Sequence, residues 1–125
     1  MIDPISGFPQ TVTIDPQTRQ LLARLSPGVR RLIIRLVEVM ERTARQNSAP
    51  ITKTELSVDH DPEDATEKIE IRQWVRGPEQ KALDVWDKIG SEVDQWVNSL
   101  SDMDEEALTE YVTFAVFSDV DDAAA

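Results

Sequence analysis

The densest group of residues able to bind a metal ion lies in the segment 59–64. It contains four carboxylates and the single histidine of the chain: Asp59, His60, Asp61, Glu63 and Asp64. Carboxylate and imidazole groups are ligands for Mn²⁺, Ca²⁺ or Mg²⁺. The spacing does not match an EF-hand, which needs acids at alternate positions and a central glycine. The alternative is a solvated hairpin loop with Asp61-Pro62 as turn former, and we predict this loop, without metal or cofactor.

Nucleophilic and phosphate-binding motifs are absent from the sequence. The chain has no cysteine and one histidine, which excludes thiolate catalysis, Cys-ligated metal sites and two-histidine mechanisms. No G-x-S-x-G, P-loop or G-x-G-x-x-G motif occurs. Asp87 and Asp94 lie at the border of the apolar face of a predicted helix, the kind of place where a carboxyl can act as a general acid. We favour a non-enzymatic protein, with a small metal-dependent hydrolase that uses the acidic segment as the alternative.

A basic face is predicted on the second helix. Arg30, Arg31 and Arg35 would contact phosphates there if the chain bound nucleic acid. The structural alternative is pairing at i,i+4 spacing within the helix, by Glu38–Arg42 and Glu41–Arg45. Because a positive charge in the first turn opposes the helix dipole, we expect an acidic partner near Arg30 and Arg31.

Charge is distributed unevenly along the chain. Residues 1–50 carry seven arginines and four acids, a net charge of +3, whereas residues 51–125 carry six bases and twenty acids, a net charge of −14. We expect the two halves to attract each other within one chain or across a dimer. The total of −11 is far from the basic balance of nucleic-acid-binding proteins. The alternatives for the acidic half are imitation of a nucleic acid toward a basic protein and a simple role in keeping the chain soluble.

The chain has more large apolar residues than a small sheet and its helices can cover. Trp74 alternates with isoleucines and falls among the charged residues of its strand, and Ile34 lies on the polar side of its helix. The run from Tyr111 to Phe117 is apolar on both faces. We predict an interface that includes Trp74, Ile34, Tyr111 and Phe117, covered by a symmetric homodimer. The alternative for Trp74 is a half-exposed side chain that shields arginine stems.

Four helical segments are expected. Asp-Pro and Ser-Pro pairs predict helix starts at Pro16 and Pro27, because Asp and Ser cap helices and proline suits the first helical position. These two helices would cover residues 16–25 and 27–47. A third helix begins at Gly77-Pro78, and a short one covers 102–109. Seven residues of the third helix share an apolar face and are predicted to be core: Leu83, Trp86, Ile89, Val93, Trp96, Val97 and Leu100.

Three strands are expected from alternation and β-propensity, at residues 52–58, 69–75 and 111–117. Residues 11–14 form a fourth strand or belong to an extended arm. The predicted fold is α+β, in the order α-α-β-β-α-β, with a small sheet of three or four strands and helices packed on one face. We expect an extended arm over 1–14, one domain over 15–118 and a frayed tail over 119–125.

Length and hydropathy limit the class of protein. With 125 residues, 40% of them hydrophobic and 30% charged, the chain has the composition of one folded domain. The N-terminal residues lack the basic and apolar regions of a secretory signal, and no run approaches the roughly 20 apolar residues of a membrane-spanning helix. We therefore expect a cytoplasmic protein without membrane contact.

The sequence favours a cytoplasmic homodimer that binds itself and another protein without catalysis. A nucleic-acid-related role is the first alternative, through the arginine face or through acidic mimicry. Salt dependence distinguishes these two versions, because phosphate binding weakens steeply with salt through counterion release.

Overall fold

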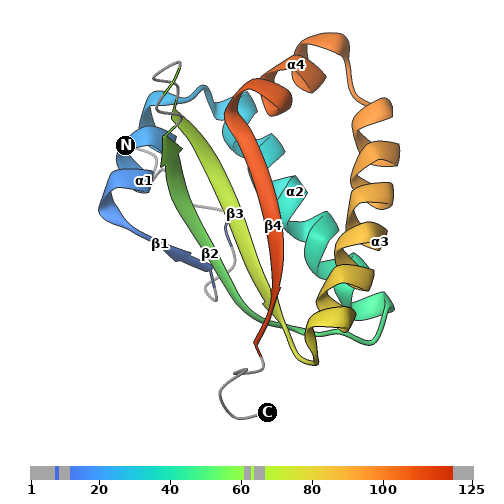
Figure 1. The fold of residues 1–125 in the computed structure, drawn as a ribbon. Coiled ribbons are helices and arrows are strands. Elements are labelled where there is room, and N and C mark those ends of the chain that lie inside the picture. Colours follow the sequence, from blue (N-terminus) through green and yellow to red (C-terminus); the bar gives the residue numbers. More distant parts are fainter. Residues whose placement is uncertain (1–7, 9–11, 61–62, 64–66, 120–125) are drawn as a thin grey trace.

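The computed structural model describes residue 8, residues 12–60, residue 63 and residues 67–119. Four helices and four strands follow one another in the order β1 (Val12–Ile14), α1 (Pro16–Arg24), α2 (Pro27–Gln46), β2 (Ile51–His60), β3 (Glu67–Val75), α3 (Glu79–Asn98), α4 (Asp102–Tyr111) and β4 (Val112–Ser118). The α+β class and the α-α-β-β-α-β order are confirmed, and the short run before α1 adds a fourth strand (Figure 1).

Three helices begin where a side chain accepts a backbone N–H. Asp15 accepts from the Thr18 N–H at 2.7 Å, Ser26 from Val29 at 3.2 Å, and Ser101 from Asp104 at 3.2 Å. Each cap satisfies one of the donors that the first turn leaves without an intrahelical partner. The bond from the Thr18 N–H also lowers the pKa of Asp15 below its ordinary value.

The four strands form one mixed sheet in the order β1-β2-β3-β4. β1 is parallel to β2, β2 and β3 form an antiparallel hairpin, and β4 lies parallel to β3. The last strand therefore joins beside the second strand of the hairpin, a position that the sequence left open. β1 and β4 are the two edges of the sheet.

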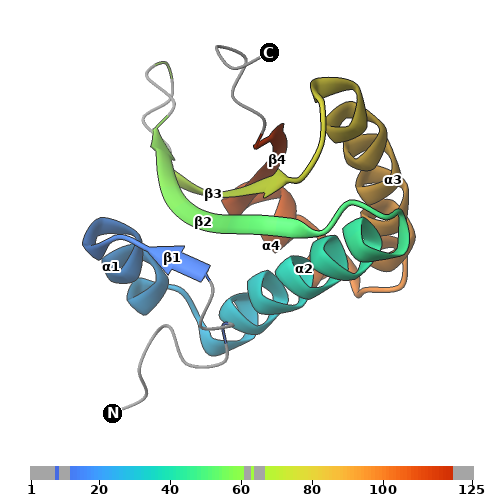
Figure 2. The ribbon, with the colours of Figure 1, turned by 90° about the horizontal axis from the view of Figure 1, so that it is seen from below.

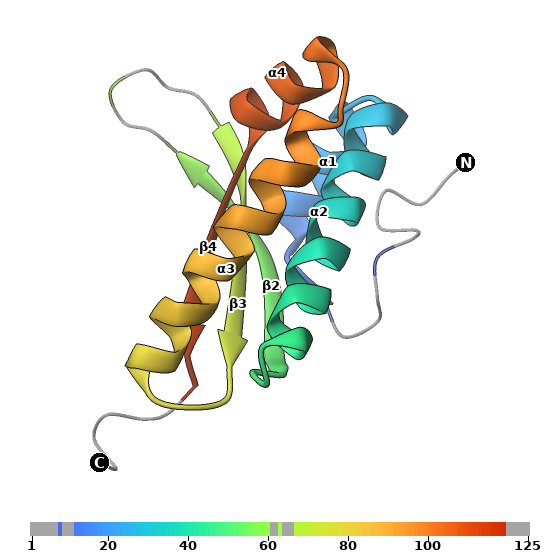
Figure 3. The ribbon, with the colours of Figure 1, turned by 90° about the vertical axis from the view of Figure 1, so that its right-hand side faces the viewer.

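The helices cover one face of this sheet. α2 and α3 pack against each other, and Figure 3 shows them side by side in front of the strands. α1 lies along β2 at the β1 edge, and α4 closes the end at which β4 begins (Figures 1 and 2). The residues of the sheet that face the helices are fully buried in the two central strands: Leu56, Ile69, Ile71, Gln73 and Val75.

Several boundaries differ from the sequence prediction. Tyr111 is the last residue of α4 and does not belong to the strand. Pro78 is the N-cap of α3, and helical geometry begins one residue later, at Glu79. β2 extends to His60, so the hairpin connection is shorter than expected. The predicted arm falls outside the described residues except for Phe8 and β1, as does the predicted tail beyond Asp119.

Within the described residues, none of the helices has the length and apolar character needed to cross a lipid bilayer. The Arg24 guanidinium and the Glu67 carboxylate, 4.0 Å apart, form an ion pair between the basic and acidic halves of the chain. This contact is long and exposed, so it contributes little to stability.

Candidate functional site

The face of the sheet opposite the helices is open and carries mainly polar side chains. Successive side chains of a strand alternate between the two faces of a sheet. The charged residues next to the buried isoleucines in the sequence therefore lie on the open face. Arg72 donates to the Glu70 carboxylate and lies 3.9 Å from the Glu55 carboxylate. Glu70 pairs with Arg72 along the same strand and Glu55 pairs with it across the neighbouring strand, so these partly exposed groups satisfy one another on the sheet surface.

One end of this open face is aromatic. Trp74 in β3 and Phe117 in β4 occupy paired positions and stack, with ring centroids 5.3 Å apart and ring planes 29° apart. The Lys53 ammonium, from the opposite side of Trp74, lies 4.8 Å from its ring centroid. The indole is therefore held between an aromatic ring and a cation, and Trp74 is half-buried while Phe117 is 40% exposed.

Helix α3 adds Leu83 beside this stack and Trp86 one turn further along the helix. Leu83 and Trp86 are each 45% exposed and lie on one face of α3 at i,i+3 spacing. Trp74, Leu83 and Phe117 take part in lining a hollow of about 270 Å³ between the start of α3 and the end of β4. We call Trp74, Leu83, Trp86 and Phe117 the apolar corner.

The prediction that Leu83 and Trp86 belong to the core was wrong. The buried side of α3 is instead centred on four smaller residues: Ala82, Val85, Ile89 and Val93. Small side chains at Ala82 and Val85 rotate the helix so that the larger Leu83 and Trp86 face outward. The four buried residues follow one another at steps of three, four and four residues, and this helical spacing is visible in the sequence. The larger apolar residues of the same helix have a similar spacing, so the sequence alone does not show which set is buried.

The corner is fixed by a short connection between β3 and α3. Gly77 has φ +131°, and a Cβ there would lie 3.2 Å from the Lys81 side chain, so this position requires glycine. The Ser118 hydroxyl donates to the Gly77 carbonyl, and the Asp119 N–H donates to the Val75 carbonyl at 3.0 Å. The end of β4 is therefore tied to the end of β3 and to the connection that leads into α3, next to the apolar corner.

The other predicted interface residues lie elsewhere. Ile34 is half-buried on α2, and Tyr111 lies at the opposite end of β4, about 20 Å from Phe117 at the rise of a β-strand. The structure therefore brings Trp74 and Phe117 together and separates them from Ile34 and Tyr111.

The arginines of the predicted basic face have mainly structural contacts. Arg30 donates to the carbonyls of Leu22 and Leu25 at 3.1 and 2.9 Å, so its charge lies at the C-terminal end of α1. The negative end of a neighbouring helix dipole thus offsets the charge of Arg30, in place of the acidic side chain expected from the sequence. Arg35 pairs with Glu38 at 3.0 Å, at i,i+3 spacing, and Arg31 is exposed.

The acidic segment is divided between a strand and the connection that follows it. Asp59 and His60 end β2, and the Gln17 amide donates to the His60 Nε2 at 3.2 Å. Glu63 is exposed, whereas Asp61 and Asp64 lie outside the described residues. In the described part of the chain, histidine and carboxylate groups do not gather in threes at a distance suited to a metal ion.

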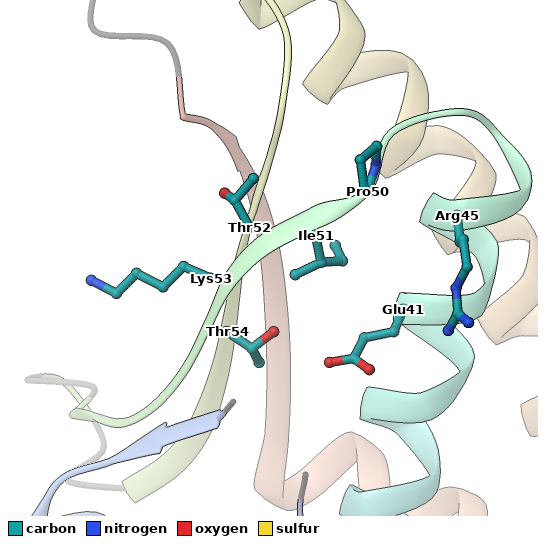
Figure 4. Close-up of a pocket in the computed structure, with 7 residues that line it drawn as sticks. All are labelled: Glu41, Arg45, Pro50, Ile51, Thr52, Lys53 and Thr54. Atoms are coloured by element: carbon teal, nitrogen blue, oxygen red, sulfur yellow. The ribbon is translucent and has the colours of Figure 1, made fainter. Parts of the chain in front are cut away.

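A second hollow, also of about 270 Å³, lies between the C-terminal half of α2 and the start of β2. Figure 4 shows the Glu41 carboxylate pointing across it toward Ile51 and Thr54. Burial raises the pKa of the Glu41 carboxyl above its ordinary value, an effect that Arg45 and Thr54 oppose. Asp87 and Asp94, the carboxylates singled out from the sequence, are exposed on α3 and lack such an environment.

Thr54 links this hollow to the core. The Gln73 amide nitrogen donates to the Thr54 hydroxyl at 3.3 Å, and both side chains are buried. The Gln73 amide oxygen has no hydrogen-bond partner among the described residues. A carboxyl, a hydroxyl and an amide therefore form a polar path into the sheet, but they do not provide the nucleophile–base pair that acyl transfer requires.

Comparison with known proteins gives no relative from which a function can be transferred. No family model matches the sequence, and neither a curated protein nor a solved structure is similar to the chain. The function must therefore be inferred from the geometry of the chain itself.

Proposed function

We propose that this chain is a non-enzymatic protein-interaction module whose contact surface is the apolar corner. The observation that carries the proposal is the gathering of exposed apolar side chains at one place. Leu83, Trp86 and Phe117 are 40–45% exposed, and the hollow beside the Trp74 ring connects α3 with the end of β4. Aromatic residues in small hollows are typical anchors of protein interfaces.

The rigidity of the corner supports a binding role. Binding by a flexible surface loses affinity because side chains and loops must be ordered. Here the stacked rings, the Lys53 contact and the bonds from Ser118 and Asp119 already fix the geometry. A partner would therefore meet a preformed surface.

A protein partner fits this surface better than a nucleic acid does. The arginines expected to contact phosphates include Arg30, which caps α1, and Arg35, which pairs with Glu38. The start of α3 beside the corner carries both signs of charge, with Lys81 and Lys88 among Glu79, Asp84 and Asp87. This end of α3 therefore lacks the excess of positive charge that would attract phosphates.

The same charges bear on the homodimer. A two-fold contact through the apolar corner would bring two α3 helices together, each with five carboxylates and two lysines, and a net like charge opposes association. We therefore propose that the main partner of the corner is a different protein.

A cytoplasmic location stays a prediction from the sequence.

The proposal is tested by affinity capture from the native host with three tagged forms of the chain. The double variant Leu83→Ser/Phe117→Ser removes exposed apolar groups from the corner, and Met103→Ser is the matched control because Met103 is 81% exposed on α4. We expect one stoichiometric protein with the wild type and Met103→Ser, and its loss with the double variant. Recovery of the same proteins by all three forms, with circular dichroism showing intact folds, would refute the proposal.

A further inference from the structure

The hollow between the C-terminal half of α2 and the start of β2, which we call the Glu41 hollow, contains two opposite charges. Three of the residues that line it are charged: Glu41, Arg45 and Lys53. The Lys53 ammonium lies on the open face of the sheet, 3.4 Å from the Glu55 carboxylate and 4.8 Å from the centroid of the Trp74 ring. The hollow itself is therefore left with one carboxylate and one guanidinium.

These two charges do not neutralise each other. Glu41 and Arg45 are four residues apart on α2, a spacing that commonly gives an ion pair. The ion pairs among the described residues do not include this one. Figure 4 shows the Glu41 carboxylate directed across the hollow toward Thr54, while Arg45 stays on the helix side. A ligand that lies in the hollow can thus meet both charges.

The wall opposite α2 supports the carboxylate and adds apolar surface. Thr54 is 2% exposed, and its hydroxyl accepts a hydrogen bond from the Gln73 amide at 3.3 Å, so the core fixes its position. Thr54 and Arg45 favour the ionised form of Glu41, against the burial that raises the pKa of this carboxyl. The Ile51 side chain extends into the same hollow (Figure 4).

The lining defines the chemistry of the ligand. An ammonium group stabilises a partly buried carboxylate such as that of Glu41, and a carboxylate forms strong charge-assisted hydrogen bonds with a guanidinium such as that of Arg45. An apolar side chain would contact Ile51. The volume of about 270 Å³ is below the roughly 300–1,000 Å³ of sites for drug-sized ligands, so a small zwitterion fits better than a larger molecule.

We propose that the Glu41 hollow binds a free α-amino acid with an apolar side chain, with its ammonium group at Glu41 and its carboxylate at Arg45. This hollow shares no lining residue with the hollow of the apolar corner. The site therefore goes beyond the interaction function proposed above and does not depend on it.

The test titrates L-leucine into the ¹⁵N-labelled full chain and follows the ¹H–¹⁵N NMR spectrum. We expect shifts of the backbone amides of Ile51, Lys53 and Thr54, with a Kd tighter than about 10 mM. Two analogues lack one charge each: 4-methylpentanoate has no ammonium group, and 3-methylbutylamine has no carboxylate. Each should bind at least about fivefold more weakly than leucine. Equal binding of all three compounds, or unchanged spectra at about 50 mM leucine, would overturn the proposal.

Two variants assign the ends of the ligand. Glu41→Gln should remove the advantage of leucine over 4-methylpentanoate, and Arg45→Gln should remove its advantage over 3-methylbutylamine. The matched controls, Glu38→Gln and Arg42→Gln, remove the same charges from exposed positions of α2 that do not line the hollow, and they should bind leucine as the wild type does. If the Glu41 and Arg45 variants keep both advantages, or the controls lose them equally, the amino acid does not occupy this hollow. The analogues test the same point on the unaltered chain.

Discussion

The two faces of the sheet differ strongly in burial and in polarity, although the same strands supply both. On the covered face, Leu56 and Ile71 are fully buried partners in adjacent strands. One residue along, Glu55 and Arg72 are paired on the open face and remain partly exposed. The alternation of a β-strand thus lets one stretch of sequence supply both the core and an accessible surface.

The two faces separate the residues that stabilise the fold from those of the proposed contact surface. The covered face holds the residues whose burial stabilises the fold, and the end of the open face holds Trp74 and Phe117, which contribute to the corner. Two polar side chains are exceptions to the apolar character of the covered face. Gln73 is fully buried on this face, and Glu41 lies at its rim.

The largest effect is expected from the centre of the covered face. Ile71→Ala removes a fully buried side chain and leaves a cavity, so we expect a loss of about 3 kcal/mol in the free energy of unfolding. Urea denaturation followed by circular dichroism measures this loss. The control is Thr113→Ala in the neighbouring strand on the opposite face, which should lose less than about 1 kcal/mol. Similar losses for both variants would contradict the distinction between the two faces.

The next largest effect is expected at Gln73, the buried polar residue of the covered face, where a substitution should increase the free energy of unfolding. Gln73→Met keeps the length of the side chain and removes an amide oxygen that lacks a partner among the described residues. Because an unsatisfied buried acceptor destabilises the fold, we expect the variant to be more stable by about 1 kcal/mol. The same urea denaturation applies. A loss of stability would mean that the Gln73–Thr54 bond outweighs the orphaned oxygen.

The ion pairs of the open face should matter less. Arg72→Ala removes the contacts with Glu70 and Glu55, but the Arg72 side chain is 42% exposed and the pairs are screened by solvent. We expect a loss below about 1 kcal/mol, and a smaller loss at high salt. Unfolding at two salt concentrations provides the measurement. A loss above about 2 kcal/mol would show that the open face contributes to stability as the covered face does.

The smallest effect on stability is expected at Glu41, at the rim of the covered face, and it depends on pH. Burial raises the pKa of Glu41, so the unfolded chain loses this proton at lower pH than the folded chain does. The contribution of Glu41 to stability is therefore most favourable below the ordinary pKa of 4.5 and falls as the pH rises through the raised value.

The test of this linkage is Glu41→Gln, which cannot ionise. We expect the variant to be more stable than the wild type at pH 7 by a few tenths of a kcal/mol, since solvent screens a half-buried group, and to match it near pH 4. Thermal melts across this pH range provide the measurement. A difference that does not change with pH would show that ionisation of Glu41 is unrelated to stability.

Much of the fold was accessible from the sequence because its signals are local. The caps at Asp15 and Ser26 marked helix starts through hydrogen bonds that span three residues. The alternation around Ile69 and Ile71 identified the buried face of β3. The composition of the candidate site was harder to predict: Trp74 and Phe117 were expected at an interface, but Leu83 and Trp86 were assigned to the core.

The errors arose where two patterns compete or where the partner is distant in the chain. On α3, large and small apolar residues give overlapping stripes, and packing against α2 selects the smaller ones. For Arg30, the sequence shows a charge that opposes its own helix dipole, but the carbonyl end of α1 that satisfies it depends on how the two helices meet.

The order of the elements, the helix starts and the two faces of β2 and β3 follow from local patterns, because they depend on backbone hydrogen bonds and side-chain periodicity within a few residues. Contacts between distant segments place β4 beside β3, stack Trp74 on Phe117 and turn Leu83 and Trp86 outward. These features depend on packing between segments far apart in the chain, where many arrangements share the same local pattern and close packing selects one.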